Sequence, residues 1–383
     1  MHDADHDMLV ALRHDLHLHP ELGFEETRTA ALVADVLQEA GIAVDRGLGV
    51  TGVVGTLRRG GGPGRIALRA DMDALAMPEQ TGLPYASAVP GRMHACGHDG
   101  HTVMLLGAAL RLAREGGFDG TVHFVFQPAE EGRGGAQRMV DEGFFDRFPV
   151  DRVYGLHNMP GLDPDEIAVV EGPQLASSDR WEVVFTGVGT HGAKPHLGRD
   201  PLVAAGAFLT AIHTIAARVV DPLAPAVVSA CALAAGDFDA LNVIPDSARV
   251  GGTARAYSPA VRDQLQAELK RIAEGVAATH GVMADFAYRR GVPPVVNDPG
   301  ATERALRAAR AALPKVRTAF PPSTAGDDFA VFAQRVPGCY VWLGNGPAVD
   351  GALHHNTRYD FNDAAIAHGV AFWTALVRSD LSG

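Results

Sequence analysis

Apolar positions along the first third of the chain follow two alternating patterns. Residues 7–19 and 25–41 repeat apolar side chains at helical spacing. Short apolar runs bounded by glycine, proline or charge read as strands, namely GVVGTL, RIALRA, TVHFVFQ and RVYGLH. Because strands that alternate with helices are typical of a parallel or mixed sheet covered on both faces, we expect an α/β fold here.

From about Ser178 the pattern changes. Four strand-like segments, the first with clear alternation in RWEVVFTGVG, are combined with two long helical segments, which suits a compact split βαβ unit. After Pro293 the first pattern resumes with a helix, a strand and a closing helix. We therefore expect a mixed-sheet domain from residues 1–177 and 292–383, and a smaller inserted α+β domain at residues 178–291.

Composition agrees with this outline. A chain of 383 residues with 47% hydrophobic and 20% charged residues can bury a core large enough for two domains. The net charge of −12 argues against a nucleic-acid partner, because binding to phosphates needs clustered Lys and Arg. The acidic N-terminus and the absence of a run of about 18 apolar residues argue against a signal peptide or membrane span. We expect a cytoplasmic protein.

Three widely spaced cysteines do not form a disulfide framework. Cys231 and Cys339 lie in apolar surroundings and are expected to be small buried residues. Cys96 differs, because it lies in HACGHDGH at residues 94–101, between histidines and glycines. Such neighbours lower the pKa of a thiol or complete a metal site.

Further ligand-type residues follow the ends of predicted strands. In open α/β sheets, ligands bind at the carboxyl ends of the strands, so these groups are expected to converge with the 94–101 loop on one crevice. They are Asp71 and Asp73, Glu130 and Glu131, His157, and His354 and His355.

This mixture of side chains favours a transition metal. Imidazole, thiolate and carboxylate suit zinc-like divalent ions, whereas calcium and magnesium prefer oxygen alone. Of two adjacent acids, one can bind metal while the other serves as general base. The sequence thus indicates metal-assisted hydrolysis of a carbonyl compound.

Eight collinear motifs between about residues 14 and 368 resemble one family. It is that of the metallo-amidohydrolases, which includes hippurate hydrolase, N-acyl-amino-acid amidohydrolases and indole-acetyl-amino-acid hydrolases, with carboxypeptidases and aminoacylases as relatives. The motifs are ALRADMDALAMPEQTGLPYAS, MHACGHDGHT, FQPAEEG, GLHNMP, TGVGTHGAKPH, NVIPDSARVGGTAR, AGDDFAVF and LHHNTRYDFND.

The resemblance implies two divalent metal ions per subunit, with zinc, manganese, nickel or cobalt all open. It implies Glu130 as general base and Asp73 as the carboxylate that orients a ligand, a role for which Asp71 and Asp99 compete. The implied metal ligands are Cys96, whose thiolate would bridge the ions, His98, Glu131, His157 and His355.

The last motif offers two consecutive histidines for one ligand. His354 is the alternative to His355, and Thr357 stands where relatives often carry proline. The remaining histidines near these motifs are expected to be loop, packing or surface residues; they are His94, His101, His14, His17 and His19. N-terminal capping of a helix explains the acid pair Asp327 and Asp328 nearly as well as catalysis does.

For the inserted domain, the resemblance implies a lid or dimerisation role. His191 would donate to the oxyanion of the tetrahedral intermediate, within one chain or across a homodimer. A surface histidine is the alternative. Asn242 and Arg255 would hold the free carboxylate of the substrate, because a guanidinium suits a carboxylate. A solvated or ion-paired side chain explains Arg255 equally well.

The implied activity is hydrolysis of the amide bond of a small N-acyl amino acid. A carboxypeptidase or dipeptidase is the alternative enzyme, although a dipeptide would need an acidic partner for its ammonium group and none is identifiable. A non-catalytic metal-binding protein is the alternative outside enzymes; it would lack the base or a ligand, and neither is missing from the motifs.

Overall fold

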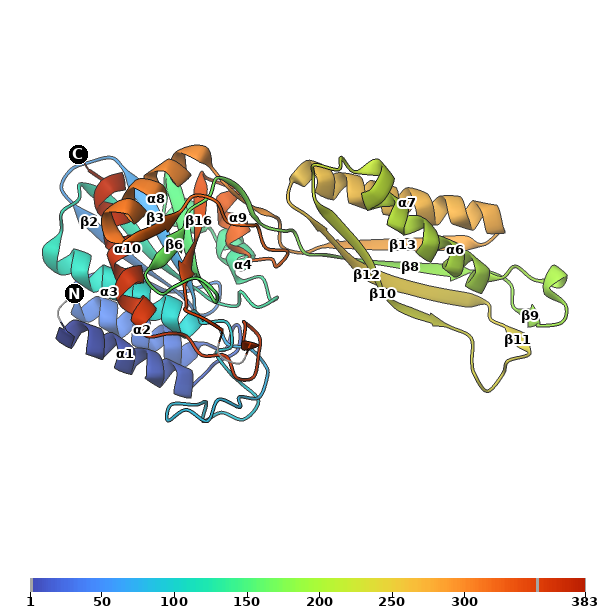
Figure 1. Ribbon diagram of the computed structural model, residues 1–383, viewed down its shortest axis with the longest axis horizontal. Coiled ribbons are helices and arrows are strands. Elements are labelled where there is room, and N and C mark those ends of the chain that lie inside the picture. Colours follow the sequence, from blue (N-terminus) through green and yellow to red (C-terminus); the bar gives the residue numbers. More distant parts are fainter. Residues whose placement is uncertain (1–2, 349–350, 383) are drawn as a thin grey trace. The chain divides into compact units, whose positions relative to one another are not determined.

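The computed structural model describes residues 3–348 and 351–382 and divides the chain into two compact units (Figure 1). Unit 1 comprises Met1–Gly172, Val296–Pro321 and Asp328–Gly383, and unit 2 comprises Pro173–Val295 and Pro322–Asp327. Each unit has its own buried apolar core. β7 (Gly172–Leu175) and β14 (Val295–Asn297) form a two-stranded sheet.

Unit 1 is built around an eight-stranded sheet in the order β1-β2-β4-β3-β5-β16-β6-β15. Its strands are β1 (Ala43–Leu48), β2 (Gly52–Arg59), β3 (Arg65–Asp71), β4 (Gly120–Gln127), β5 (Arg152–Met159), β6 (Glu166–Ala168), β15 (Lys315–Arg317) and β16 (Gly338–Gly344). The neighbours β4, β3, β5 and β16 run parallel, whereas β1, β2 and β6 pair antiparallel to a neighbour. The predicted mixed sheet is confirmed.

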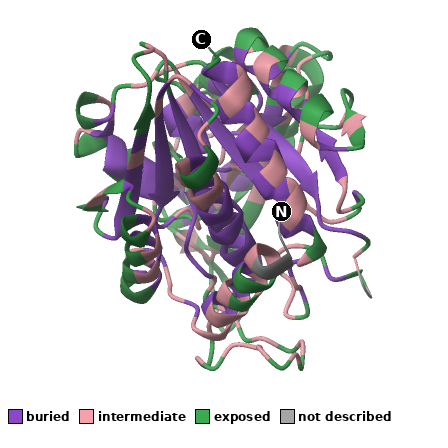
Figure 2. Ribbon diagram, turned by 90° about the vertical axis from the view of Figure 1, so that its left-hand side faces the viewer, coloured by how far each residue is buried: buried purple, intermediate pink, exposed green. Residues whose placement is uncertain are grey.

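Helices cover both faces of this sheet. They are α1 (Asp3–Leu18), α2 (Thr27–Glu39), α3 (His98–Glu115), α4 (Gly135–Asp141), α5 (Phe144–Arg147), α8 (Pro299–Ala312), α9 (Phe329–Ala333) and α10 (Ala364–Asp380). Tyr154 and Leu156 of β5 point into the core with α3 and α10, whereas Gly155 between them faces Phe329 of α9. The central strands and the inward helix faces are buried (Figure 2).

Three helices begin with the same local signal, an acceptor residue followed by proline. Asp200, Ser258 and Asp298 each accept from the backbone N–H groups of a first helical turn, in α6 (Pro201–Thr214), α7 (Pro259–His280) and α8 respectively. Proline at the first helical position needs no hydrogen-bond partner for its nitrogen and already has a helical φ. These helix starts are therefore fixed by short stretches of sequence.

Unit 2 consists of a four-stranded antiparallel sheet and two helices. The sheet order is β10-β12-β8-β13, with β8 (Asp179–Thr186), β10 (Ala226–Ala235), β12 (Ser247–Ala256) and β13 (Met283–Arg290). α6 (Pro201–Thr214), extended by the π-helix η2 (Ile215–Val219), and α7 (Pro259–His280) pack on the sheet. The short strands β9 (Thr190–His191) and β11 (Val243–Ile244) pair with each other, and η1 spans Pro195–Leu197. The predicted smaller α+β domain is confirmed.

One cysteine prediction is wrong and another is confirmed. Cys231 is exposed, although its apolar neighbours suggested burial. It lies on β10, an outer strand of the sheet, where the register with β12 shifts between Ala230 and Ala232. The residues that follow it on this outer strand, such as Leu233, are exposed as well, so this half of β10 lies outside the core of unit 2. Cys339, on the central strand β16, is buried as expected.

The segment Pro201–Val219 is the one helix in the described part of the chain that is long and apolar enough to cross a membrane by length and composition. Phe208 and Ile212 on one side of it belong to the core of unit 2. Leu202 and Val203 on the other side are 46% and 52% exposed. The helix therefore combines a core-facing side with an exposed apolar side.

Candidate metal centre

A glycine-dependent turn places the side chains of the 94–101 loop. Gly97 precedes α3 with a φ of 94°, in the left-handed region that favours glycine. A Cβ at this position would lie 2.6 Å from Oδ1 of Asn158 and 2.7 Å from the hydroxyl oxygen of Tyr359. Cys96 and His98 flank this glycine and are both buried. The close approach of the backbone is what brings the thiol and the imidazole into the interior of unit 1.

The other ligand-type residues reach the same region from the carboxyl ends of parallel strands. Asp71 ends β3, Glu130 and Glu131 follow β4, and His157 lies near the end of β5. His355, in the loop after β16, donates its backbone N–H to the carbonyl of Ala95 over 2.8 Å. That bond joins the last segment to the 94–101 loop.

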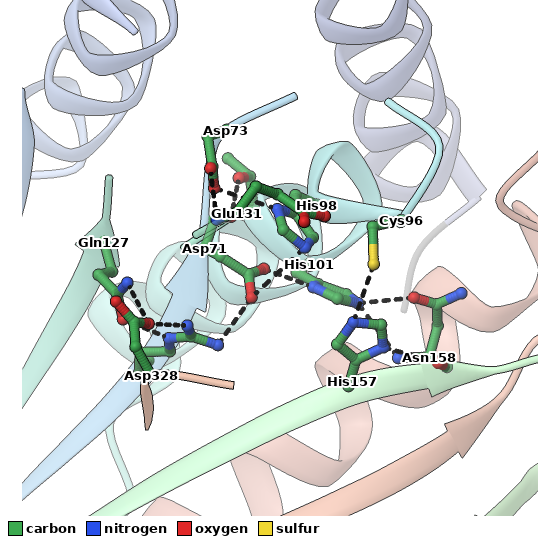
Figure 3. Close-up of polar contacts among 12 residues, drawn as sticks. Asp71, Asp73, Cys96, His98, His101, Gln127, Glu131, His157, Asn158 and Asp328 are labelled. Carbon is green, nitrogen blue, oxygen red and sulfur yellow. Dashed lines mark hydrogen bonds and ion pairs between the residues drawn. The ribbon is translucent and has the colours of Figure 1, made fainter. Parts of the chain in front are cut away.

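Two groups of three ligand atoms share the Cys96 sulfur. One consists of Cys96, His98 and His157, the other of Cys96, Glu131 and His355, and within each group all ligand atoms lie within 4.8 Å of one another. Nε2 of His157 lies 3.4 Å from the Cys96 Sγ (Figure 3). Two ligand sets with a common sulfur are the arrangement expected for two cations bridged by one thiolate.

A buried atom without a hydrogen-bond partner shows that this donor set fits a divalent cation. Nε2 of His98 makes no hydrogen bond, which is costly for a buried polar atom unless another group satisfies it. Burial, and then the nearby Glu131 charge, raise the pKa of the Cys96 thiol. A thiolate at this depth therefore requires a positive neighbour. Thiolate, imidazole and carboxylate together suit a first-row transition ion.

The three competing carboxylates have different surroundings. Asp73 accepts from His98 Nδ1 at 3.3 Å and from the backbone N–H of Glu131 at 2.9 Å, so it contacts two of the proposed ligands. Asp71 lies 2.6 Å from His101 Nδ1 and 3.7 Å from His98 Nε2. Asp99 faces away from these ligands and binds Arg13 and His17.

Two histidines that the motifs left as packing residues are fully buried and belong to polar networks. His101 links Asp71 to the side chain of Asn158, 2.8 Å from its Oδ1 (Figure 3). His17 of α1 lies 2.8 Å from the Asp99 carboxylate, which raises the pKa of His17 to about 9 against the opposing effect of burial. In the HDGH sequence, His98 and His101 are three residues apart and lie on the same face of α3. This spacing is the sequence signal that could have predicted a shared environment for the two histidines.

The two consecutive histidines of the last loop point to different partners. Nε2 of His355 lies 3.2 Å from Oε1 of Glu131, and its backbone adopts a left-handed φ of 62°. His354 is bound to the side-chain amide of Asn158 at 3.2 Å. Burial lowers the pKa of His354 to about 3, so this ring is neutral. A strained φ in a non-glycine residue is typical of functional loops.

Asp328 does not act as a helix cap. It stands at the N-terminus of α9, but its side chain makes no capping hydrogen bond. Its carboxylate instead accepts from Arg69 at 3.2 Å, from the Gln127 amide at 2.7 Å and from the backbone N–H of Ala136 at 2.9 Å (Figure 3). Asp328 thus connects β3, β4 and α4 around the loop after β4 that carries Glu130 and Glu131, which we call the glutamate loop.

The predicted residues of unit 2 lie at two ends of its sheet. His191 on β9 and Asn242 beside β11 are exposed neighbours, joined by the hydrogen bond from the Gly192 N–H to the Asn242 carbonyl. Arg255 lies eight residues beyond Ser247, the first residue of β12. At about 3.3 Å per residue this is roughly 26 Å along the strand. One small carboxylate cannot touch both Asn242 and Arg255 of the same unit.

Comparison with known proteins agrees with this architecture. The chain is 38% identical over 367 residues to a hippurate hydrolase of Campylobacter jejuni, covering 95% of this chain and 94% of that protein. It is 40% identical over 344 residues to an N-acetylcysteine deacetylase of Bacillus subtilis, covering 89% of each.

Among solved structures, a dinuclear metal-binding peptidase of the M20 family from Bacillus subtilis superposes with a TM-score of 0.87 and 36% identity over 99% of both chains. The sequence profile of peptidase family M20/M25/M40 matches residues 67–379. That match spans most of unit 1 and all of unit 2, so the chain belongs to peptidase family M20/M25/M40.

Proposed function

We propose that the protein hydrolyses the amide bond of N-acyl amino acids and releases a carboxylic acid and a free amino acid. The observation that carries the proposal is the pair of ligand groups sharing the Cys96 sulfur, with Glu130 beside His98 and Glu131 within 4.8 Å. The relatives support it, since one is a hippurate hydrolase and another an N-acetylcysteine deacetylase. Both names describe cleavage of an acyl group from an amino acid.

Two divalent ions are part of this proposal. Cys96, His98 and His157 would hold one, and Cys96, Glu131 and His355 the other. Bound ions would act as Lewis acids on the scissile carbonyl and on water. A sulfur and imidazole donor set favours zinc, cobalt or nickel over manganese, because softer ions prefer these ligands. Asp73 would keep His98 in its orientation through the contact at Nδ1.

Glu130 supplies the proton transfer in this mechanism. It lies in the loop after β4, and its carboxylate is within 4.8 Å of the ligand atoms of His98 and Glu131, which is close enough to act on a water bound among them. It removes the proton from water as the oxygen attacks the carbonyl carbon. It then delivers a proton to the leaving nitrogen, which departs as a neutral amine.

We further propose that the enzyme works as a homodimer assembled through unit 2. His191 would donate to the oxyanion, and Asn242 and Arg255 would hold the substrate carboxylate. Within one copy of unit 2, Asn242 and Arg255 are too far apart to hold the same carboxylate. Two copies can supply the two groups to one site. Unit 2 also exposes large apolar side chains, with Leu223, Phe238 and Leu241 exposed by 90%, 92% and 81%. In this reading residues 178–291 form the lid and dimerisation domain.

A cytoplasmic location suits the cysteine chemistry proposed here. All three cysteines are free, and Cys96 has to remain reduced to bind metal. A reducing compartment maintains that state.

Release of free amino acid from a panel of substrates tests the proposed activity. The panel contains N-acetyl, N-benzoyl and indole-acetyl amino acids with unblocked dipeptides alongside, each with metal-loaded and chelator-treated protein. We expect metal-dependent release from the acylated substrates. Release from dipeptides alone would favour a dipeptidase or carboxypeptidase, and release that survives complete removal of metal would reject the mechanism.

Glu130 and Glu131 provide a matched pair for the mechanism. Glu130→Gln should lower kcat by about 10²- to 10⁴-fold because proton transfer is lost, while metal content stays unchanged. Glu131→Gln should lose bound metal, measured by elemental analysis after dialysis. Full turnover in Glu130→Gln would rule out the assigned base, and full metal retention in Glu131→Gln would rule out the assigned ligand.

A further inference from the structure

A carboxyl group outside the ligand set is buried behind the glutamate loop. Glu26, just before α2, is 0% exposed. Its Oε1 accepts from the backbone N–H of Ala129 at 2.8 Å, and its Oε2 accepts from the Thr51 hydroxyl at 2.6 Å. Ala129 immediately precedes Glu130 and Glu131. Glu26 therefore joins the segment before α2 and the β1–β2 turn to the loop that carries both proposed functional acids.

The backbone around these contacts is strained. Four non-glycine residues in the described part of the chain have a left-handed φ, and three of them lie at these contacts. Ala129 is itself a hydrogen-bond partner of Glu26. Phe24 lies two residues before Glu26, and Val50 immediately precedes Thr51. A left-handed conformation is unfavourable for a residue with a Cβ, because the Cβ approaches the following carbonyl oxygen. Such residues persist where their surroundings fix them, commonly at functional sites.

Close packing also fixes Ala129 from the other side. A Cβ at Gly23 would lie 2.9 Å from both Cα and Cβ of Ala129, so the two backbones are in direct contact. Arg133, further along the same loop, donates to the Gly23 carbonyl at 3.1 Å. The Glu131 N–H is held separately by Asp73 at 2.9 Å. The loop is thus anchored on both sides of Glu130.

We propose that Glu26 is a positioning residue that holds Ala129 in its left-handed conformation and thereby aims Glu130 and Glu131. Without this acceptor, the Ala129 N–H would be buried and unpaired. The hydrogen bond that keeps the Ala129 backbone from relaxing to an unstrained φ would also be lost. Relaxation at Ala129 changes the direction in which the next two side chains leave the backbone. A misplacement of about 1 Å at a reacting group can cost about 10²-fold in rate.

Burial of the Glu26 carboxyl is energetically unfavourable, which indicates that its two acceptor atoms are needed at this position. It raises the pKa of Glu26 to about 7, even though the hydrogen bonds from Thr51 and Ala129 act in the opposite direction. An apolar side chain would fill the same space without that cost. The acceptor atoms are what an apolar residue could not replace.

Three variants of Glu26 test the proposal. Glu26→Gln keeps an acceptor for Ala129 and can donate its amide to Thr51, so kcat should stay within about threefold of wild type. Glu26→Leu removes the acceptor at similar size, and kcat should fall about 10- to 100-fold with a smaller change in KM. Glu26→Asp is one methylene shorter and should give an intermediate loss; it serves if the leucine variant does not fold.

A second substitution separates positioning from general stability. Ala129→Gly removes the steric cost of the left-handed φ, so in the Glu26→Leu background it should restore kcat severalfold. Because relief of this strain also stabilises the folded chain, the melting temperature is recorded alongside, and a gain in melting temperature without a gain in kcat would count against positioning. Unchanged kcat in both Glu26→Leu and Glu26→Asp would overturn the proposal. Equal damage in Glu26→Gln and Glu26→Leu would overturn it as well.

The inference rests on the proposed function for its kinetic test, so a binding measurement provides an independent one. Metal-free protein is titrated with Zn²⁺ in a calorimeter. In Glu26→Leu, the affinity for one of the two zinc equivalents should fall about 10-fold or more, because Glu131 is displaced. In Glu26→Gln, both affinities should stay as in wild type. If wild type hydrolyses no substrate in the panel, the proposed function fails while this comparison still decides the role of Glu26. Identical titrations of all variants would argue against it.

Discussion

His354 and His355 are adjacent in sequence but occupy opposite environments. The His355 ring faces Glu131, and the His354 ring is bound to Asn158. The left-handed φ of His355 turns its side chain away from that of its neighbour. At this scale, backbone conformation decides which of two identical side chains faces the Glu131 carboxylate.

This difference gives a prediction with a built-in control. His355→Ala should lose about one of two metal equivalents per chain, because one ligand group keeps only Cys96 and Glu131. His354→Ala should retain both, since its ring binds an amide. Elemental analysis of dialysed protein provides the measurement. The reverse result would make His354 the ligand.

At the scale of elements, a buried charge cluster fastens α1 to α3 and to the last loop. Arg13 of α1 is 0% exposed, and its Nη1 lies 3.3 Å from Asp99 of α3 and 2.9 Å from Asp360. His17, one turn further along α1, binds the same Asp99. Asp99 adjoins the proposed ligand His98, so the cluster also fixes the start of α3.

Removing the Arg13 guanidinium from this cluster should strongly destabilise the fold. Arg13→Met leaves Asp99 buried with one fewer partner, and the free energy of unfolding should fall by about 3–5 kcal/mol. Arg28→Ala is the control, because Arg28 pairs with Asp15 on the surface, and its loss should cost at most about 1 kcal/mol. Urea unfolding followed by circular dichroism measures both. Equal losses would mean that the buried cluster contributes no more than a surface pair.

At the scale of the whole molecule, the residues proposed for the active site are divided between unit 1 and unit 2, and the proposed homodimer would bring them together from two chains. All proposed metal ligands and Glu130 belong to unit 1, whereas His191, Asn242 and Arg255 belong to unit 2. The opposite positions of Asn242 and Arg255 on unit 2 are what favours contributions from two copies.

Hybrid dimers test this assembly. Mixing His191→Ala protein with Glu130→Ala protein should restore activity to about a quarter of wild type, because half of randomly exchanged dimers are hybrids and each hybrid has one intact site. Glu130→Ala mixed with the double variant carrying both substitutions should stay inactive. Absence of recovery despite proven subunit exchange would place His191 within its own chain or outside the mechanism.

The sequence by itself determined the elements and the chemistry of this protein. Apolar periodicity and proline-containing helix starts specify local structure through contacts only a few residues long. The motif residues Cys96, Glu130 and Glu131 are informative because their side-chain types suit few reactions. Both the mixed sheet with its smaller α+β domain and the family could therefore be predicted.

Only the tertiary structure decided what depends on long-range contacts. The exposure of Cys231 follows from its place in the exposed half of an outer strand, which apolar neighbours in sequence cannot reveal. His101, His17 and Glu26 acquire their roles from partners 25 to 103 residues away, such as Asp71, Asp99 and Ala129. Burial makes those polar contacts strong, and burial is a property of the folded chain rather than of any segment of it.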